Sequence, residues 1–148
     1  MIYLDSCALV KLVRAEDGSS ALQEWLDERA DELIVTSELS RAEVLRTVRR
    51  NNHRDTGELI DPAAVAEELS EAAEVLTAVA QIAVDSDILD RAGAVTAPMI
   101  RTLDAIHLVS AAHWDPSDVE LVTYDHRLAA AAADAGMTVV APGDPAAA

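Results

Sequence analysis

The chain has 148 residues, of which 27 are acidic and 11 basic, so its formal net charge is −16. This length predicts a single domain that buries about 68–70% of the surface its unfolded chain exposes. Apolar residues make up 51% of the sequence and aromatics only 3%, with no phenylalanine, which predicts an aliphatic core. The sequence shows no transmembrane span or secretory signal. Its single cysteine, Cys7, excludes an internal disulfide. We therefore expect a cytoplasmic protein.

Short apolar runs alternate with helical patterns along the whole chain. In the first half we expect a strand at 2–4, a helix from about 6 to 15 capped by Ser6, a helix at about 19–28 capped by Ser19 or Ser20, a strand at 33–36 and a helix at 37–54. In the second half we expect a helix at 62–76 begun by Asp61 and Pro62, a strand at 81–84, a helix capped by Ser86, a helix at 102–112, a strand at 121–124, a helix at 127–135 and a strand at 138–140. The alternation predicts a three-layer α/β/α sandwich with a mainly parallel central sheet. One domain should span 1–141, with a loose tail at 142–148.

Four carboxylates stand at positions where this fold would bring them to one edge of the sheet. Asp5 and Asp125 each follow an apolar run that predicts a buried strand. In an open α/β sheet, ligands bind at the carboxyl ends of the strands. Glu43 and Asp104 fall on predicted helices that could reach the same edge. Asp104 lies in a first helical turn, where an acid also has the structural use of complementing the helix dipole.

Four negative charges in one cleft repel one another, and this repulsion suggests a cation. At about 4 Å and an effective dielectric of about 20, each close pair costs roughly 4 kcal/mol. An all-oxygen anionic site suits Mg²⁺ or Mn²⁺. We expect Asp5 and Asp104 to be direct metal ligands, and Glu43 and Asp125 to act partly directly and partly through bound water. The sequence leaves one metal and two metals equally open. Such a site is suited to phosphodiester hydrolysis.

The basic residues are clustered, and this matters for the interpretation of the negative net charge. A net charge of −16 by itself argues against a nucleic-acid partner, because phosphate contacts require lysine and arginine. Five of the eleven basic residues, however, fall within fourteen positions, at 41, 46, 49, 50 and 54. One interpretation is a solvated helix face. The alternative is a basic rim beside the acidic site, with phosphate contacts from Lys11, Arg41, Arg46 and Arg49.

Other potentially reactive side chains favour structural interpretations. Cys7 has no evident histidine partner and is expected to be a small buried residue. His107 lies three positions after Asp104 and shares its helical face. It is expected to be a hydrogen-bonded histidine in the core or beside the site, with a metal role as the alternative. The other histidines show no zinc spacing, and the chain has no glycine-rich phosphate loop.

Four segments resemble, in order, the acidic motifs of PIN-domain ribonucleases. They are IYLDS at 2–6, TS and RAEV within 36–44, LDAIHL at 103–108 and TYDHRL at 123–128. The length and the span 1–140 resemble the VapC toxins of bacterial toxin–antitoxin pairs. The resemblance implies that Asp5, Glu43 and Asp104 are the core acidic residues and that Asp125 is the fourth, more variable one. It also implies supporting hydroxyls at Ser6 and Thr123.

The resemblance further implies an activity and a set of partners. The activity would be Mg²⁺- or Mn²⁺-dependent cleavage of RNA, often transfer or ribosomal RNA. The partners would be a second copy of the chain and a VapB-type antitoxin. Two alternatives belong to other classes. One is a receiver-type phosphoacceptor domain, which needs a paired acid after strand one and a late lysine, whereas this chain has Ser6 after Asp5 and only Lys11. The other is a non-catalytic PIN-like module that binds RNA or protein.

Overall fold

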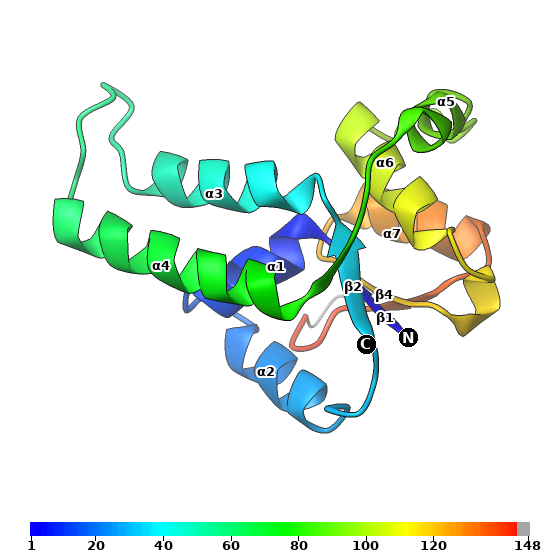
Figure 1. Ribbon diagram of the computed structural model, residues 1–148, viewed down its shortest axis with the longest axis horizontal. Helices are drawn as coiled ribbons and strands as arrows, with labels where there is room; N and C mark the ends of the chain where they lie inside the picture. The colour runs from blue at the N-terminus through cyan, green and yellow to red at the C-terminus, as the bar shows by residue number, and fades with distance from the viewer. Residues whose placement is uncertain (145–148) are drawn as a thin grey trace.

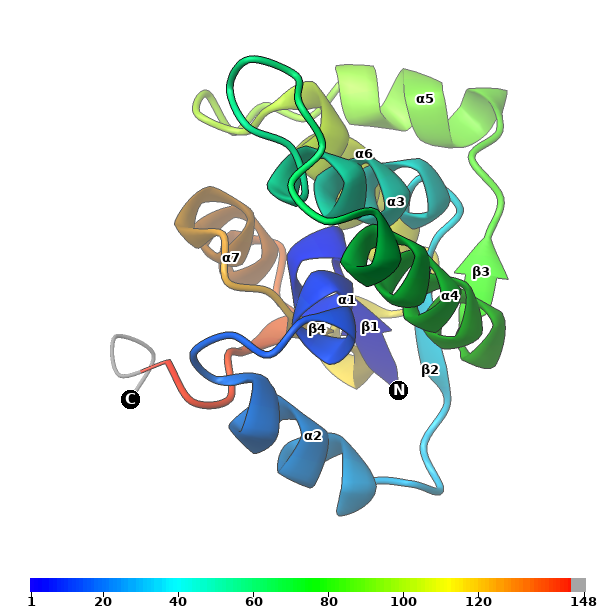
Figure 2. The same ribbon diagram turned by 90° about the vertical axis from the view of Figure 1, so that its left-hand side faces the viewer.

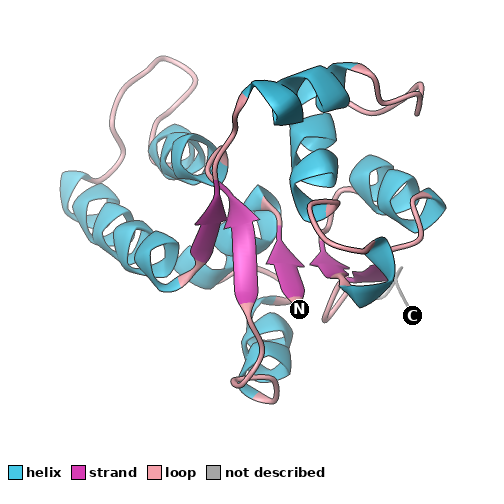
Figure 3. Ribbon diagram, turned by 45° about the vertical axis from the view of Figure 1, so that its right-hand side comes forward, coloured by secondary structure: helices cyan, strands magenta, loops and turns pink. Residues whose placement is uncertain are grey.

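The computed structural model describes residues 1–144 and is built around a five-stranded parallel sheet (Figure 3). Its strands are β1 (Ile2–Leu4), β2 (Ile34–Ser37), β3 (Ala80–Ile82), β4 (Glu120–Val122) and β5 (Thr138–Val140). They lie side by side in the order β3-β2-β1-β4-β5, and every neighbouring pair is parallel. The prediction of a mainly parallel sheet is therefore confirmed.

Helices cover both faces of the sheet, as Figures 1 and 2 show. The helices are α1 (Ser6–Val13), α2 (Ser19–Asp27), α3 (Ser40–Asn51), α4 (Pro62–Ala78), α5 (Ser86–Gly93), α6 (Thr102–Ala111) and α7 (His126–Asp134), with a short 3-10 turn at Pro116–Asp118. Side chains from α1 to α4 form one buried cluster, and side chains from α5 to α7 form two others. This division confirms the three-layer α/β/α arrangement.

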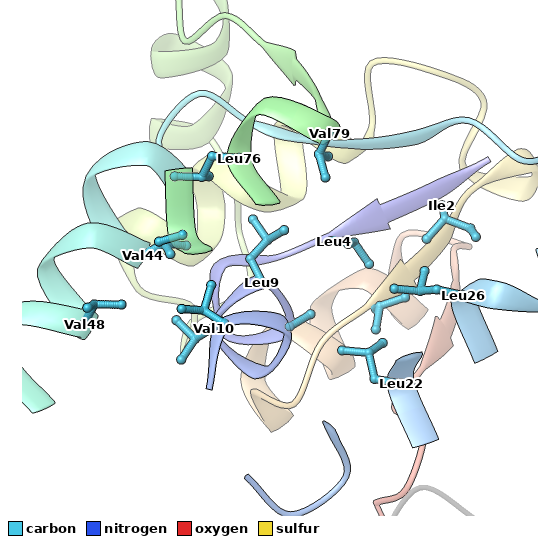
Figure 4. Packing of buried hydrophobic residues seen from close by; sticks show 14 residues of the cluster. Ile2, Leu4, Leu9, Val10, Leu22, Leu26, Val44, Val48, Leu76 and Val79 are labelled. Carbon is cyan, nitrogen blue, oxygen red and sulfur yellow. The ribbon is translucent and has the colours of Figure 1, made fainter. Parts of the chain in front are cut away.

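The central strand β1 shows how the sequence fills both layers. Successive side chains of a strand point to opposite faces. Ile2 and Leu4 are fully buried in the cluster with α1 to α4, part of which Figure 4 shows, whereas Tyr3 is fully buried in the cluster with α6 and α7. A strand that is buried on both faces has an uninterrupted apolar sequence, as parallel strands do. The packed side chains are overwhelmingly aliphatic, as the composition predicts.

The expected helix caps at Ser6 and Ser86 are wrong by one residue. Asp5 and Asp85, which come directly before these serines, are the N-cap residues of α1 and α5. Each has an extended backbone, and its carboxylate accepts a hydrogen bond from a backbone N–H in the first helical turn. This is the geometry that N-cap aspartates provide. A strand-ending acid therefore also starts the following helix. Helix α2 begins after Gly18, and neither Ser19 nor Ser20 is its cap.

Helix α3 is shorter than expected, at Ser40–Asn51 rather than 37–54. Ser37 still belongs to β2, and beyond α3 the chain turns through a loop in which the N–H of Gly57 donates to the carbonyl of Arg54 (2.8 Å). Gly57 has φ +83°, a conformation that glycine adopts without strain. Asp61 then caps α4 as predicted. Helices α3 and α4 pack together and form the arm on the left of Figure 1.

The beginning of the expected loose tail is packed against the domain. The hydroxyl of Tyr124 donates to the carbonyl of Pro142 (2.9 Å). A Cβ atom on Gly143 would lie 2.9 Å from both Gly18 and Ala21, so this close approach requires glycine. The remainder of the predicted tail, 145–148, lies outside the described residues. Within the described residues, no helix is long and apolar enough to cross a membrane.

The strand order places a crevice at one point of the sheet. From β1 the chain winds outward through β2 and β3 on one side, and β4 and β5 lie on the other side. The order therefore reverses between β1 and β4. In doubly wound sheets, ligands bind outside the carboxyl ends of the strands at this reversal. Asp5 follows β1 and Asp125 follows β4, so the fold brings both to that position.

Candidate active site

A pocket of about 550 Å³ lies at the carboxyl ends of β1 and β4 and is lined by α1, α3, α6 and the segment after β4. Three of the four predicted acids, Glu43, Asp104 and Asp125, line it directly. Asp5 lies beneath them, with only 4% of its surface exposed, and contacts the lining residue Cys7. The structure thus brings the four carboxylates, from four distant segments, into one region.

Asp5 is a buried carboxylate with several hydrogen-bond donors. The thiol of Cys7 lies 2.9 and 3.0 Å from its two oxygens, and the backbone N–H of Ala8 donates to Oδ1 (2.8 Å). The hydroxyl of Thr123 donates to Oδ2 (2.5 Å) and accepts from the backbone N–H of Asp125 (3.0 Å). Burial raises the pKa of Asp5, although these donors act in the opposite direction. Thr123 thus links Asp5 to the backbone of Asp125, and its supporting role stays a prediction.

Glu43 is held from α3 against two other elements. Its Oε2 accepts hydrogen bonds from the hydroxyl of Ser6 and from Nε2 of His107, the latter at 2.8 Å. Burial acts to raise the pKa of Glu43, but the hydrogen bonds from His107 and Ser6 outweigh it, so the net pKa is lowered. The hydroxyl of Ser6 thus contacts one of the four acids, and its supporting role stays a prediction. The carboxylate of Glu43 remains an anion at the edge of the pocket.

Asp104 is the least satisfied of the four acids. Its Oδ2 atom is buried and has no hydrogen-bond partner among the described residues. Burial raises the pKa of Asp104, and the negative charge of Asp125 raises it further. A buried polar atom without a partner is rare and costs about 1–3 kcal/mol. Oδ2 of Asp104 therefore lacks the partner that a buried carboxylate oxygen usually has.

Asp125 is stabilised by its own helix. Its Oδ1 accepts from the backbone N–H groups of Arg127 (2.8 Å) and Leu128 (3.3 Å), which makes it the N-cap of α7. Its Oδ2 lies 3.2 Å from Nη2 of Arg127. Burial acts to raise the pKa of Asp125, but these N–H donors and the guanidinium lower it overall. The charge that faces Asp104 is thus partly neutralised by a neighbouring arginine.

The acids of the pocket do not form a closed cage of metal ligands. Within the described residues, no three histidine, cysteine, aspartate or glutamate side chains are arranged to hold a metal ion together. Mg²⁺ keeps several waters and commonly uses only one or two carboxylates. Oδ2 of Asp104 has no hydrogen-bond partner among the described residues, and the hydrogen-bond donors to the buried carboxyl group of Asp5 are uncharged. Both are oxygen ligands of the kind that Mg²⁺ and Mn²⁺ prefer.

The predicted phosphate-binding residues do not lie together. Arg46 and Arg49 line a second pocket of about 530 Å³ at the far end of α3, and Arg41 lines a third pocket beside α4. Lys11 lines the acidic pocket, where its Nζ lies 3.8 Å from Glu16. The structure therefore separates Arg41 from the other arginines, although all three belong to the same helix.

Several residues in or beside the pocket had no assigned role in the predictions. Arg50, which was counted in the basic cluster without a predicted phosphate contact, lines both the acidic and the basic pocket, and it stands seven positions after Glu43, on the same helical face. This spacing could have indicated it. Arg127 was quoted in the fourth motif without a role, although a neighbouring basic residue is an obvious partner for Asp125. Cys7 is half-buried and hydrogen-bonded to Asp5, so it is more than the packing residue that we expected.

Comparison with known proteins identifies the family. The family model described as the PIN domain matches residues 2–134. The chain belongs to the PIN-domain family. It is 39% identical over 145 residues to the Mycobacterium tuberculosis protein named Ribonuclease VapC35, covering 97% of this chain and 98% of that protein. It is also 39% identical over 141 residues to Ribonuclease VapC46 of the same organism, covering 95% of this chain and 97% of that protein.

Two solved structures share the fold. One is Mycobacterium tuberculosis VapC20, described as a sarcin-ricin loop cleaving toxin, with a TM-score of 0.66 and 16% identity over 96% of this chain and 100% of that one. The other is VapBC2 from Rickettsia felis bound to a fragment of promoter DNA, with a TM-score of 0.63 and 15% identity over 96% and 99%. At this identity they support the PIN fold alone. Membership of this family removes the receiver-type alternative.

Proposed function

We propose that this protein is a metal-dependent endoribonuclease, the toxin component of a toxin–antitoxin pair. The observation that carries the proposal is the pocket at the reversal of strand order, where Glu43, Asp104 and Asp125 converge above Asp5. The relatives named ribonucleases match nearly the whole chain, so their chemistry is the one this pocket is expected to perform. A PIN-like module that had lost catalysis would not be expected to keep all four acids, and this argues against the non-catalytic alternative.

The metal is proposed to be Mg²⁺, with Mn²⁺ as a substitute, and its direct protein ligands to be Asp5 and Asp104. A bound cation of this kind lowers the pKa of its water and polarises the phosphoryl oxygen. Asp104 has the oxygen without a partner, and Asp5 must exchange the thiol of Cys7 for the cation. Glu43 and Asp125 keep their protein hydrogen bonds and orient or deprotonate bound water.

The substrate is proposed to be structured RNA, such as ribosomal or transfer RNA. Arg46 and Arg49 at the end of α3, together with Arg50 between the two pockets, form a basic path that leads to the acidic pocket. Phosphate contacts of this type position a nucleic acid without reading its sequence. Lys11 lies at the acidic pocket itself and could contact the phosphate next to the cleaved bond. Arg41 is the weakest of the predicted contacts because it faces another side of α3.

The partners are proposed from the same family relationship. A solved relative is a VapBC2 complex, and we infer that a VapB-type antitoxin silences this chain. We further propose a homodimer in the cytoplasm, where the RNA substrate and the antitoxin would be found. An antitoxin that covers the pocket would have to satisfy the same anionic groups as the cation, so a basic side chain is the natural contact.

Cleavage of RNA by the purified chain tests the proposed activity. We expect cleavage with Mg²⁺ or Mn²⁺, none with excess chelator, and recovery when the metal is restored. Asp104→Asn keeps the shape of the side chain but removes its charge, and should reduce the rate by about 10²–10⁴-fold. Cleavage that is equally fast in chelator, or equally fast in Asp104→Asn, would contradict the assignment. Asp134→Asn, a substitution near the end of α7, is the matched control and should leave the rate unchanged.

A further inference from the structure

A buried hydrogen-bond chain leads from the middle of the sheet to the edge of the pocket. The phenol oxygen of Tyr3 lies 2.8 Å from Nδ1 of His107, and Nε2 of His107 lies 2.8 Å from Oε2 of Glu43. Tyr3 is completely buried on β1, and His107 on α6 is 3% exposed. The two rings meet edge to face, at an interplanar angle of 79°. The chain therefore connects β1, α6 and α3, three elements that are distant in the sequence.

For a neutral imidazole, the hydrogen-bond partners select one tautomer of His107. Burial raises the pKa of Tyr3 well above its ordinary value, so the phenol keeps its proton and can donate it to Nδ1. A neutral imidazole that accepts at one nitrogen carries its proton on the other. Nε2 then donates to Glu43, whose carboxylate can only accept. With the proton on Nδ1 instead, lone pairs of Nε2 and Oε2 would face each other at 2.8 Å.

The donors fall on one side of the Glu43 carboxylate. His107 and Ser6 both contact Oε2, and Oε1 accepts no hydrogen bond from the described residues. Glutamate has a long, flexible side chain, and that of Glu43 is 23% exposed. Two fixed donors therefore define the orientation of the carboxylate and leave Oε1 for a ligand of the pocket.

We propose that His107 is a positioning residue that acts through Glu43, and that Tyr3 sets the tautomer in which His107 can do so. Neither ring needs to touch the substrate or the metal. The arrangement is analogous to the partners that orient metal-binding side chains in other proteins, whose loss typically weakens metal affinity 10- to 100-fold. The inference rests on the proposed function, because it assumes that Glu43 faces a divalent cation or its water.

A purely structural histidine would behave differently. If His107 only filled space between the sheet and α6, its replacement would lower the melting temperature and leave metal binding to the folded protein unchanged. If His107 positions Glu43, metal binding should weaken even in a folded variant, and a side chain with an N–H in the right place should restore it. If His107 acts through Glu43, replacing His107 should cause no further loss of metal binding in a protein in which Glu43 has already been replaced.

The experiment measures Mn²⁺ binding to the purified full chain by electron paramagnetic resonance of the free ion, without RNA. The variants are His107→Leu, His107→Gln, Tyr3→Phe, Glu43→Gln and the double variant His107→Leu/Glu43→Gln. Glutamine can place an amide N–H where Nε2 stood, whereas leucine cannot. Tyr3→Phe removes only one hydroxyl. Circular dichroism establishes that each variant is folded, and if His107→Leu does not fold, Tyr3→Phe and His107→Gln decide the question.

We expect His107→Leu and Glu43→Gln each to raise the Mn²⁺ dissociation constant about 10- to 100-fold. The double variant should be no weaker than Glu43→Gln alone. His107→Gln should remain within about threefold of wild type, and Tyr3→Phe should fall between His107→Gln and His107→Leu. Unchanged binding in His107→Leu, or a loss that adds in full to that of Glu43→Gln, would overturn the proposal.

A second measurement does not depend on metal binding. Nitrogen NMR of the imidazole, assigned by the signal lost in His107→Gln, should show an unprotonated, hydrogen-bonded Nδ1 and a protonated Nε2. Tyr3→Phe should alter the Nδ1 signal. A proton on Nδ1 of the wild-type ring would overturn the role of Tyr3. If the wild-type chain bound no Mn²⁺ yet showed the expected tautomer, the proposed metal-dependent function would fail while the hydrogen-bond chain stood.

Discussion

Helix α3 presents two regions that contrast in how their charges are held. Near its start, Glu43 is fixed by His107 and Ser6. Toward its end, Arg46 and Arg49 are exposed and line an open pocket. In the first region, buried hydrogen-bond partners hold one carboxylate in a defined position. In the second region, the arginines are exposed and contribute mainly their positive charge. Substitutions should therefore act almost all-or-none among the acids and in proportion to charge among the arginines.

The largest effect is expected for Asp5→Asn. Asparagine can still accept from the backbone N–H of Ala8 and cap α1, so the substitution removes the charge and replaces the oxygen that accepts from Thr123. We expect the single-turnover rate of RNA cleavage to fall by about 10²–10⁴-fold. Asp61→Asn is the matched control, because Asp61 also caps a helix but lies outside the acidic pocket. Comparable cleavage rates for Asp5→Asn and wild type would show that activity does not depend on the individual carboxylate of Asp5.

A smaller and graded effect is expected at the other end of α3. Phosphate contacts make the affinity for RNA depend on salt concentration. Arg46→Ala with Arg49→Ala should reduce the slope of log affinity against log salt by about 1 for each arginine. Binding can be measured by fluorescence anisotropy with a catalytically inactive background such as Asp104→Asn.

The control for the arginine pair removes the same charge elsewhere. Arg41 lies on α3 but lines a different pocket, and Arg91 lies on α5 beside Asp87. Arg41→Ala with Arg91→Ala should leave the salt slope close to that of wild type. If the two pairs reduced the slope equally, RNA affinity would depend on net charge alone, and the basic pocket would have no special part in it.

The same contrast explains which parts of the site the sequence predicted. Asp5 and Asp125 follow apolar runs, and local pattern therefore located them at strand ends. The parallel sheet then brought them together, as expected for this fold class. The contact between Tyr3 and His107 joins residues 104 positions apart, and it depends on the angle at which α6 packs on the sheet. A local sequence pattern does not predict the packing angle between a helix and a sheet.

The burial of individual side chains was the other feature of the site that the sequence did not predict. Asp5 was expected to be a direct metal ligand, but the sequence did not show that its carboxyl group is almost completely buried and contacted by the thiol of Cys7. The starts of α1 and α5 differ from the prediction by one residue, because the strand-ending aspartate, and not the serine after it, has the extended backbone of an N-cap. By contrast, the place of Arg50 beside the acidic pocket could have been predicted, because it repeats the helical position of Glu43 two turns later.

The smallest expected effect concerns stability, and it separates Asp5 from Asp125. The pKa of Asp5 is raised above its ordinary value of 3.8 in the folded protein, and that of Asp125 is lowered below it. As pH rises from 3.8 through the raised pKa, the folded protein holds the Asp5 proton that the unfolded chain has lost, so wild-type stability declines. The contribution of Asp125 to stability depends on pH in the opposite direction. It is present above pH 3.8 and is lost as pH falls through the lowered pKa of Asp125.

These signs predict that two similar substitutions have opposite consequences. In chelator at pH 7, Asp5→Asn should raise the melting temperature and Asp125→Asn should lower it, by about 2–4 °C for each kcal/mol. Thermal unfolding between pH 4.5 and 8 should show the gain from Asp5→Asn shrinking toward the acid end, because protonation removes the charge that the variant lacks. If Asp5→Asn were less stable than wild type at pH 7, the donors from Cys7, Thr123 and Ala8 would outweigh the cost of burying its charge, and Asp5 would be held in the same way as Asp125.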